Sequence, residues 1–245
     1  MMTVGSTGDV AAEPRAPQTG NDARRRGQSG PPLWIPALAF AGLVIVSVVL
    51  ASSMPQPSAS ASEALEYFRD NETAARVAGI LQFGSAFPLA IWTAVVYRRL
   101  RRLGVTAPGP AIALVGGVMS AVLMALCGVL GWTASRAASL DSPELARVLA
   151  DLMFAAGGPA HVVPFGLLLA GVAVPALLVR LTPTWFAWAG IVLAAVAVLG
   201  TLALFDTAFG IPLPIARFGG LIWLVAASVL LPRERQRRTA PQTAG

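Results

Sequence analysis

The sequence predicts an all-α membrane protein built as a bundle of six transmembrane helices. The 245 residues are 56% hydrophobic and only 12% charged, whereas soluble domains carry about 25% charged residues. Six apolar segments reach the ~20 residues that cross a bilayer core. No segment shows the short alternating pattern of a transmembrane β-strand. Because backbone groups in lipid must be satisfied internally, each segment is expected to be a helix.

The N-terminal region is predicted to be a tail followed by a signal anchor. Residues 1–30 are rich in Gly, Pro, Ala and Arg and show no apolar periodicity, which is typical of disorder. Three arginines, at 24–26, precede the first apolar run at 33–53. That run is longer than the ~7–15 residues of a signal-peptide core. This length favours an uncleaved anchor over the alternative, a cleaved signal peptide.

The spans are expected within a membrane domain at 31–232, and a basic tail follows at 233–245. If the N-terminus is cytoplasmic, 13 of the 18 arginines fall on the cytoplasmic side, and the chain has no lysine. Such a bias places both termini and the second and fourth loops in the cytoplasm. The arginines cluster at the ends of the spans, so the net charge of +6 indicates membrane topology and does not indicate nucleic-acid binding. The predicted spans are 33–53, 75–97, 109–132, 157–179, 184–205 and 212–231.

Two of the outer loops are predicted to contain short helices. In residues 60–70, Ser60 lies three positions before Glu63, the spacing of a capping box. In residues 141–154, Asp141 lies three positions before Glu144, and Pro143 follows early. Two arrangements stay open: each helix lies along the outer interface, or each extends the following span outward.

One face of the second span is small and weakly polar. Ala75, Gly79, Gln82, Ala86 and Thr93 follow one another at helical spacing. Small residues let another helix approach closely. We therefore expect Ala75, Gly79 and Ala86 to serve helix packing, and Gln82 to point at a neighbouring helix.

The only histidine belongs to "AAGGPAHVVP" (155–164), where Gly-Gly-Pro predicts a bend at the start of the fourth span. Ionisable residues at membrane depth are functional hypotheses by default. We hypothesise an outer polar pocket; alternatively, each residue reaches the headgroups by itself. Arg147 and Asp151 are spaced for an ion pair, and Asp206 is the nearest candidate partner of the arginine in the last span. The pocket would be lined by His161, Arg76, Arg217, Asp151, Asp206 and Gln82.

The sequence lacks the residue sets and motifs of common enzyme active sites. One cysteine and one histidine cannot build a zinc site or paired haem ligands. There is no HExxH, P-loop or GxSxG motif. We expect no catalytic residues, metal or cofactor, and interpret the chain as a non-enzymatic membrane protein that binds a small molecule, lipid or partner subunit. A small transporter or permease is the alternative, and a membrane enzyme the second. No carboxylate lies in mid-membrane, which argues against proton coupling.

Three segments carry a family resemblance: "YRRLRRLG" (97–104), "LTPTWFAWAGIVLAAVAVLG" (181–200) and "ARFGGLIWLVAASVLLPRER" (216–235). They combine a basic stop after a span, a Pro-Thr-Trp entry into a late span and a Gly-Gly-x-x-Trp final helix. In these features the chain resembles the uncharacterised multi-pass integral membrane proteins of high-GC bacteria, grouped as domains of unknown function. The resemblance implies a bacterial cytoplasmic (inner) membrane location. Such families have no established catalytic residues, so no residue roles carry over to this chain.

Overall fold

A computed structural model describes residues 32–55, 57 and 59–232. The predicted tails at 1–30 and 233–245 lie outside the described residues. Within the described part, the chain forms α-helices and short 3₁₀ turns and no strand. The helices are α1 (Trp34–Leu50), α2 (Ala61–Asp70), α3 (Glu72–Arg102), α4 (Gly109–Ala137), α5 (Pro143–Gly157), α6 (Pro159–Leu178), α7 (Thr184–Leu199) and α8 (Pro212–Leu230), with turns η2 (Ala138–Leu140), η3 (Gly200–Leu204) and η4 (Thr207–Gly210).

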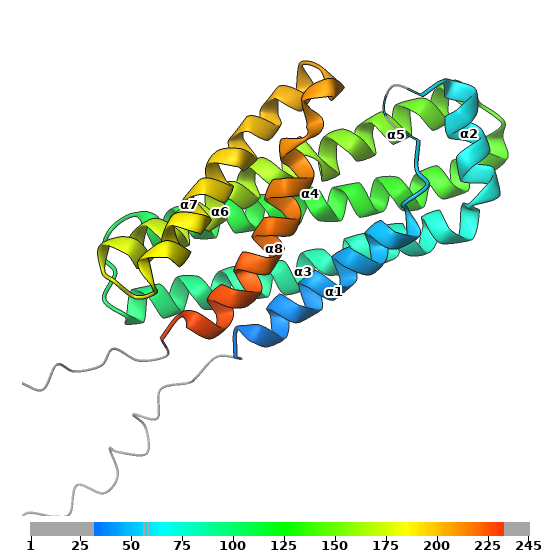
Figure 1. Ribbon diagram of the computed structural model, residues 1–245. Helices are drawn as coiled ribbons and strands as arrows, with labels where there is room; N and C mark the ends of the chain where they lie inside the picture. The colour runs from blue at the N-terminus through cyan, green and yellow to red at the C-terminus, as the bar shows by residue number, and fades with distance from the viewer. Residues whose placement is uncertain (1–31, 56, 58, 233–245) are drawn as a thin grey trace, which may run out of the picture. The chain divides into compact units, whose positions relative to one another are not determined.

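The predicted fold class is confirmed: the described chain is an all-α membrane bundle of about six helices (Figure 1). Five helical stretches are long and apolar enough to span: α3, α4, the joined α5–α6, α7 with η3, and η4 with α8. α1 is shorter, with 17 residues, and ends at Leu50, whereas the sequence predicted a span to residue 53. At 1.5 Å per residue α1 measures ~25 Å, somewhat less than the hydrocarbon core.

α4 lies between α3 and α6, and glycines let their backbones come close. A Cβ atom at Gly79 of α3 would lie 2.7 Å from the backbone nitrogen of Trp132 on α4. A Cβ atom at Gly116 of α4 would lie 2.6 Å from the backbone nitrogen of Leu168 on α6. Real side chains do not tolerate such separations, so these positions require glycine. Small residues of this kind are the usual means of helix packing in membranes.

The main core joins α1, α3, α4, α6, α7 and α8. Trp92 of α3 is fully buried and donates its indole N–H to Ser228 Oγ of α8 at 2.8 Å, so its polar edge is satisfied. The opposite surfaces of the same helices expose large apolar side chains, for example Val122 at 60% and Ile222 at 73%. Exposed apolar side chains around a buried core are what a lipid solvent requires.

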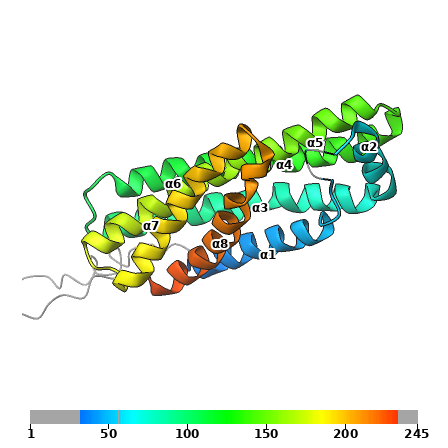
Figure 2. The same ribbon diagram turned by 45° about the horizontal axis from the view of Figure 1, so that its top comes forward.

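α2 and α5 lie at one end of the bundle, here called the α2–α5 end (Figures 1 and 2). The capping box is confirmed: Ser60 Oγ accepts from the Glu63 backbone, and the Glu63 carboxylate accepts from the Ser60 backbone at 3.0 Å. The spacing of Asp141 and Glu144 does not form a cap, because Asp141 adopts a left-handed conformation that ends η2. Ser142 caps α5 instead and accepts from the Leu145 backbone.

The structure distinguishes the two arrangements proposed for the loop helices. α5 continues into α6 through a break at Gly158 and packs beside α4, so it extends the fourth span outward. α2 is separated from α3 at Asn71, lies across the ends of its neighbours (Figure 1), and packs its Phe68 in a small core with Leu149 of α5.

The opposite end of the bundle is rich in arginine. α1 begins and α8 ends there, next to the C-terminal end of α3 (Figure 2). Arg99 of α3 donates to the backbone carbonyl of Leu231 at 3.3 Å, which ties the end of α8 to this level. This arginine-rich end consists of Arg98, Arg99, Arg101, Arg102 and Arg180.

Candidate functional site

A cavity of about 630 Å³ lies at the α2–α5 end. Its walls come from the end of α1 and the segment after it, from α2, α3 and α5, and from η4 and the start of α8. Most lining side chains are apolar or small, among them Val48, Phe68, Phe154, Leu213 and Phe218. A volume of this size falls within the ~300–1,000 Å³ of pockets that bind small molecules.

Gln82 is the polar centre of the inner wall. Its carbonyl oxygen accepts from Ser47 Oγ of α1 at 2.9 Å. Its amide nitrogen lies 3.1 Å from Met124 Sδ and 3.4 Å from Cys127 Sγ, both on α4. Because sulfur is a weak acceptor, both amide hydrogens are only weakly satisfied by these contacts. The side chain joins three helices, which fits the expectation that it points at a neighbouring helix.

The outer wall carries an ion pair. Arg147 Nε lies 3.0 Å from Asp151 Oδ2, as the i,i+4 spacing predicted. Arg147 also donates to the backbone carbonyl of Ala59, and so holds the segment before α2 against α5. The nearby Tyr67 is buried, and burial raises the pKa of its hydroxyl while a hydrogen bond with Ser53 lowers it. Tyr67 is therefore uncharged at neutral pH.

Arg217 enters the cavity from the first turns of α8. Its guanidinium donates to the carbonyl of Gly157, the last residue of α5. That carbonyl is free of its helical partner because the chain breaks at Gly158, where φ is −85° and ψ −111°. Arg217 Nε is buried without a hydrogen-bond partner, and no described carboxylate forms an ion pair with Arg217. Three of the predicted site residues, Gln82, Asp151 and Arg217, thus line one cavity.

His161 lies outside the lining of this cavity. It is fully buried between α4 and α6, and its ring stacks on Phe165 with centroids 5.7 Å apart. Nδ1 lies 2.8 Å from Ser120 Oγ and 3.0 Å from the Ser120 carbonyl oxygen. A proton on Nδ1 satisfies the carbonyl and leaves Nε2 as a lone pair without a partner among the described residues. His161 therefore joins two helices inside the bundle.

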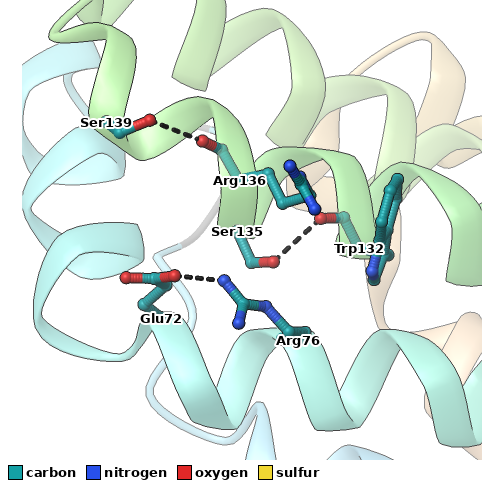
Figure 3. Close-up of polar contacts among 6 residues, drawn as sticks. All are labelled: Glu72, Arg76, Trp132, Ser135, Arg136 and Ser139. Carbon is teal, nitrogen blue, oxygen red and sulfur yellow. Dashed lines mark hydrogen bonds and ion pairs between the residues drawn. The ribbon is translucent and has the colours of Figure 1, made fainter.

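Arg76 and Asp206 are also engaged elsewhere. Figure 3 shows the guanidinium of Arg76 directed along α3 to Glu72, with which it forms an i,i+4 ion pair. Across from them on α4, Arg136 lies over the ring of Trp132, 5.1 Å from the ring centroid. Asp206 does not pair with Arg217; its carboxylate caps η4 by accepting from the Ala208 backbone at 2.9 Å. Arg76 and Asp206 thus both bind groups close to them in sequence, and not the more distant residues of the predicted pocket.

The sequence analysis missed the partners of Gln82 at the inner wall, of which Cys127 also lines the cavity itself. Ser47 is a polar residue within the first apolar run, and this pattern could have indicated a polar contact with another helix. Met124 and Cys127 are apolar residues of an apolar span with no sequence signal for a site, and only the fold reveals their contact with Gln82. Among the described residues, no group of three or more His, Cys, Asp or Glu side chains is placed to hold a metal ion. Comparison of the chain with protein-family models, curated proteins and solved structures gave no match.

Proposed function

We propose that this multi-pass membrane protein binds a small amphiphilic molecule in the cavity at the α2–α5 end, and that its role is binding and not catalysis. The observation that carries the proposal is the cavity itself, which combines an apolar wall with the weakly satisfied amide of Gln82 and the unpartnered Nε of Arg217. Binding pockets typically pair such walls with a few polar groups that orient the ligand.

The proposed location is the cytoplasmic membrane of a bacterium, with both termini in the cytoplasm. The gathering of arginines at the end where α1 begins and α8 ends supports this orientation. In that orientation the α2–α5 end and its cavity face outward. The protein's immediate partner is then the lipid bilayer, and the bound molecule or a membrane partner subunit reaches the cavity from the outer side.

The test is to fill the cavity and measure what the protein retains. Ala150 of α5 lines the cavity, whereas Ala155 of the same helix does not, and both are partly buried. We expect Ala150→Phe to lose a co-purifying molecule that wild type and Ala155→Phe keep, as seen by native mass spectrometry after gentle extraction. Unfolding measurements on both variants check that the bundle is intact. Equal occupancy in both variants, or an empty wild type, would reject the proposal.

Transport is the second candidate, and the broken helix favours it. The C-terminal end of α5 and the N-terminal end of α6 meet at Gly158 beside the cavity, as half-helices do at many transporter sites. A carrier must expose its site alternately to both sides. Gln82→Cys in a Cys127→Ala background, probed with a membrane-impermeant maleimide from each side, separates the candidates. Labelling from both sides favours transport, and labelling from the outer side only favours binding.

A further inference from the structure

Two arginines line the cavity, and their surroundings differ. Arg147 is neutralised by Asp151 and is further satisfied by the Ala59 carbonyl. In the described part of the chain, Arg217 has one neutral partner, the Gly157 carbonyl, and its Nε is buried without any. A guanidinium carries five N–H donors, so Arg217 keeps most of its hydrogen-bonding capacity and all of its charge unmatched. Among the residues that the structure describes, the cavity therefore contains one uncompensated cation.

That cation lies at membrane depth. Arg217 and Leu231 are 14 residues apart on α8 and its end, which corresponds to ~21 Å along the helix axis. Leu231 is bonded to Arg99 at the arginine-rich end. With the arginine-rich end placed at one interface of a hydrocarbon core ~30 Å thick, Arg217 would lie within the core, several ångströms short of the opposite interface. An unpaired charge there is expensive, and such residues mark binding sites for charged groups.

The apolar walls around Arg217 indicate what the remainder of the ligand must be. Its neighbours on the cavity surface include Leu213 and Phe218 of α8 and Phe154 of α5. An inorganic anion would neutralise the guanidinium but would leave this apolar surface against water. A neutral lipid would cover the surface but would leave the charge uncompensated. A molecule with one anionic group and an apolar chain does both.

We propose that the cavity binds an anionic amphiphile, with a carboxylate or phosphate on Arg217 and an acyl chain along the apolar wall. This inference rests on the proposed function, because it assigns the chemical class of the ligand that the cavity takes. The competing explanation is that Arg217 only caps α5. Arg217→Gln discriminates the two, since a glutamine amide keeps a donor near the position of Arg217 Nε but carries no charge. Arg147→Gln is the matched control from the same cavity.

The experiment compares two ligands that differ only in the head group. Delipidated protein in a neutral detergent is titrated with cetyl phosphate and with cetyl alcohol, and binding is followed by native mass spectrometry. Charge-assisted hydrogen bonds contribute ~1.5–3 kcal/mol, so wild type is expected to favour the phosphate about tenfold to a hundredfold. Arg217→Gln should lose this preference and still bind the alcohol, whereas Arg147→Gln should keep it.

Additional measurements identify the source of the anionic ligand and define the results that would overturn the inference. In nanodiscs, a preference for phosphatidylglycerol over phosphatidylcholine supports a bilayer lipid as the source, and a response to cetyl phosphate alone supports a free amphiphile. Inorganic phosphate binding as tightly as cetyl phosphate overturns the inference, as does equal binding of cetyl phosphate and cetyl alcohol to wild type. In that last case the proposed function stands. If wild type binds neither compound, the proposed function fails as well.

Discussion

The close approach of α3 and α4 leads to a prediction that uses two glycines of one helix. A Cβ at Gly79 would lie 2.7 Å from Trp132 N and 2.8 Å from Gly128 O, which are backbone atoms that cannot rotate away. A Cβ at Gly84, also within α3, has open space around it. Gly79→Ala and Gly84→Ala therefore make the same chemical change in a tight and an open setting.

The magnitude follows from two opposing effects. Alanine favours a helix over glycine by up to ~1 kcal/mol, and this gain applies to both variants. Overpacking a close contact costs ~1–3 kcal/mol, and this applies to Gly79→Ala only. The helix term cancels in the difference, so Gly79→Ala should be less stable than Gly84→Ala by ~1–3 kcal/mol.

The assay is reversible unfolding in mixed micelles with increasing dodecyl sulfate, followed by helical circular dichroism. Gly84→Ala should unfold at the same or a higher denaturant fraction than wild type, and Gly79→Ala at a lower one. Coincident curves for the two variants would refute the reasoning, because they would show that α3 and α4 are not held at backbone contact beside Gly79.

Three more predictions follow from the described contacts. Ser60→Ala removes the capping box of α2 and should cost ~1 kcal/mol, seen as about fivefold faster amide exchange confined to the first turn of α2; unchanged exchange there would contradict the cap. Ser120→Ala removes one hydrogen bond to His161 and should cost ~1 kcal/mol in the same unfolding assay, whereas Ser139→Ala, in an exposed turn, should be neutral; equal effects would mean that the buried contact adds nothing. In a Cys127→Ala background, Ser62→Cys should react with an impermeant maleimide in intact cells, and Thr106→Cys only after lysis; the reverse pattern would invert the proposed topology.

The sequence was sufficient for the features that depend on neighbours along the chain. Apolar length predicted the bundle, Ser60 and Glu63 predicted the cap of α2, and Gly157-Gly158-Pro159 predicted the break before the fourth span. Each depends on the composition or spacing of a single stretch. The spacing rule for N-caps fails at the start of α5, where two residues with capping side chains are adjacent. Asp141 ends η2, and Ser142 forms the N-cap of α5.

The site was only partly predictable because it depends on long-range contacts. His161 meets Ser120, which is 41 residues away in the sequence, and Arg217 meets Gly157, which is 60 away. Nothing close to Arg217 along the chain identifies its partner. The sequence offered Asp206 as the nearest acid, yet Asp206 caps η4, which leaves the guanidinium to a carbonyl and the cavity.

The hydrogen-bonding need of the α5–α6 break can be used to test whether Arg217 has a structural or a binding role. The freed Gly157 carbonyl needs only one donor, and a neutral amide would supply it without moving a charge into hydrocarbon. Replacing buried charged groups by neutral ones is often neutral or stabilising when it leaves no buried charge unpaired. We therefore expect delipidated Arg217→Gln to unfold at the same or a higher denaturant fraction than wild type. A loss of more than ~2 kcal/mol would show that the charge itself holds the fold together; retained stability means that the cation is kept for something that binds to it.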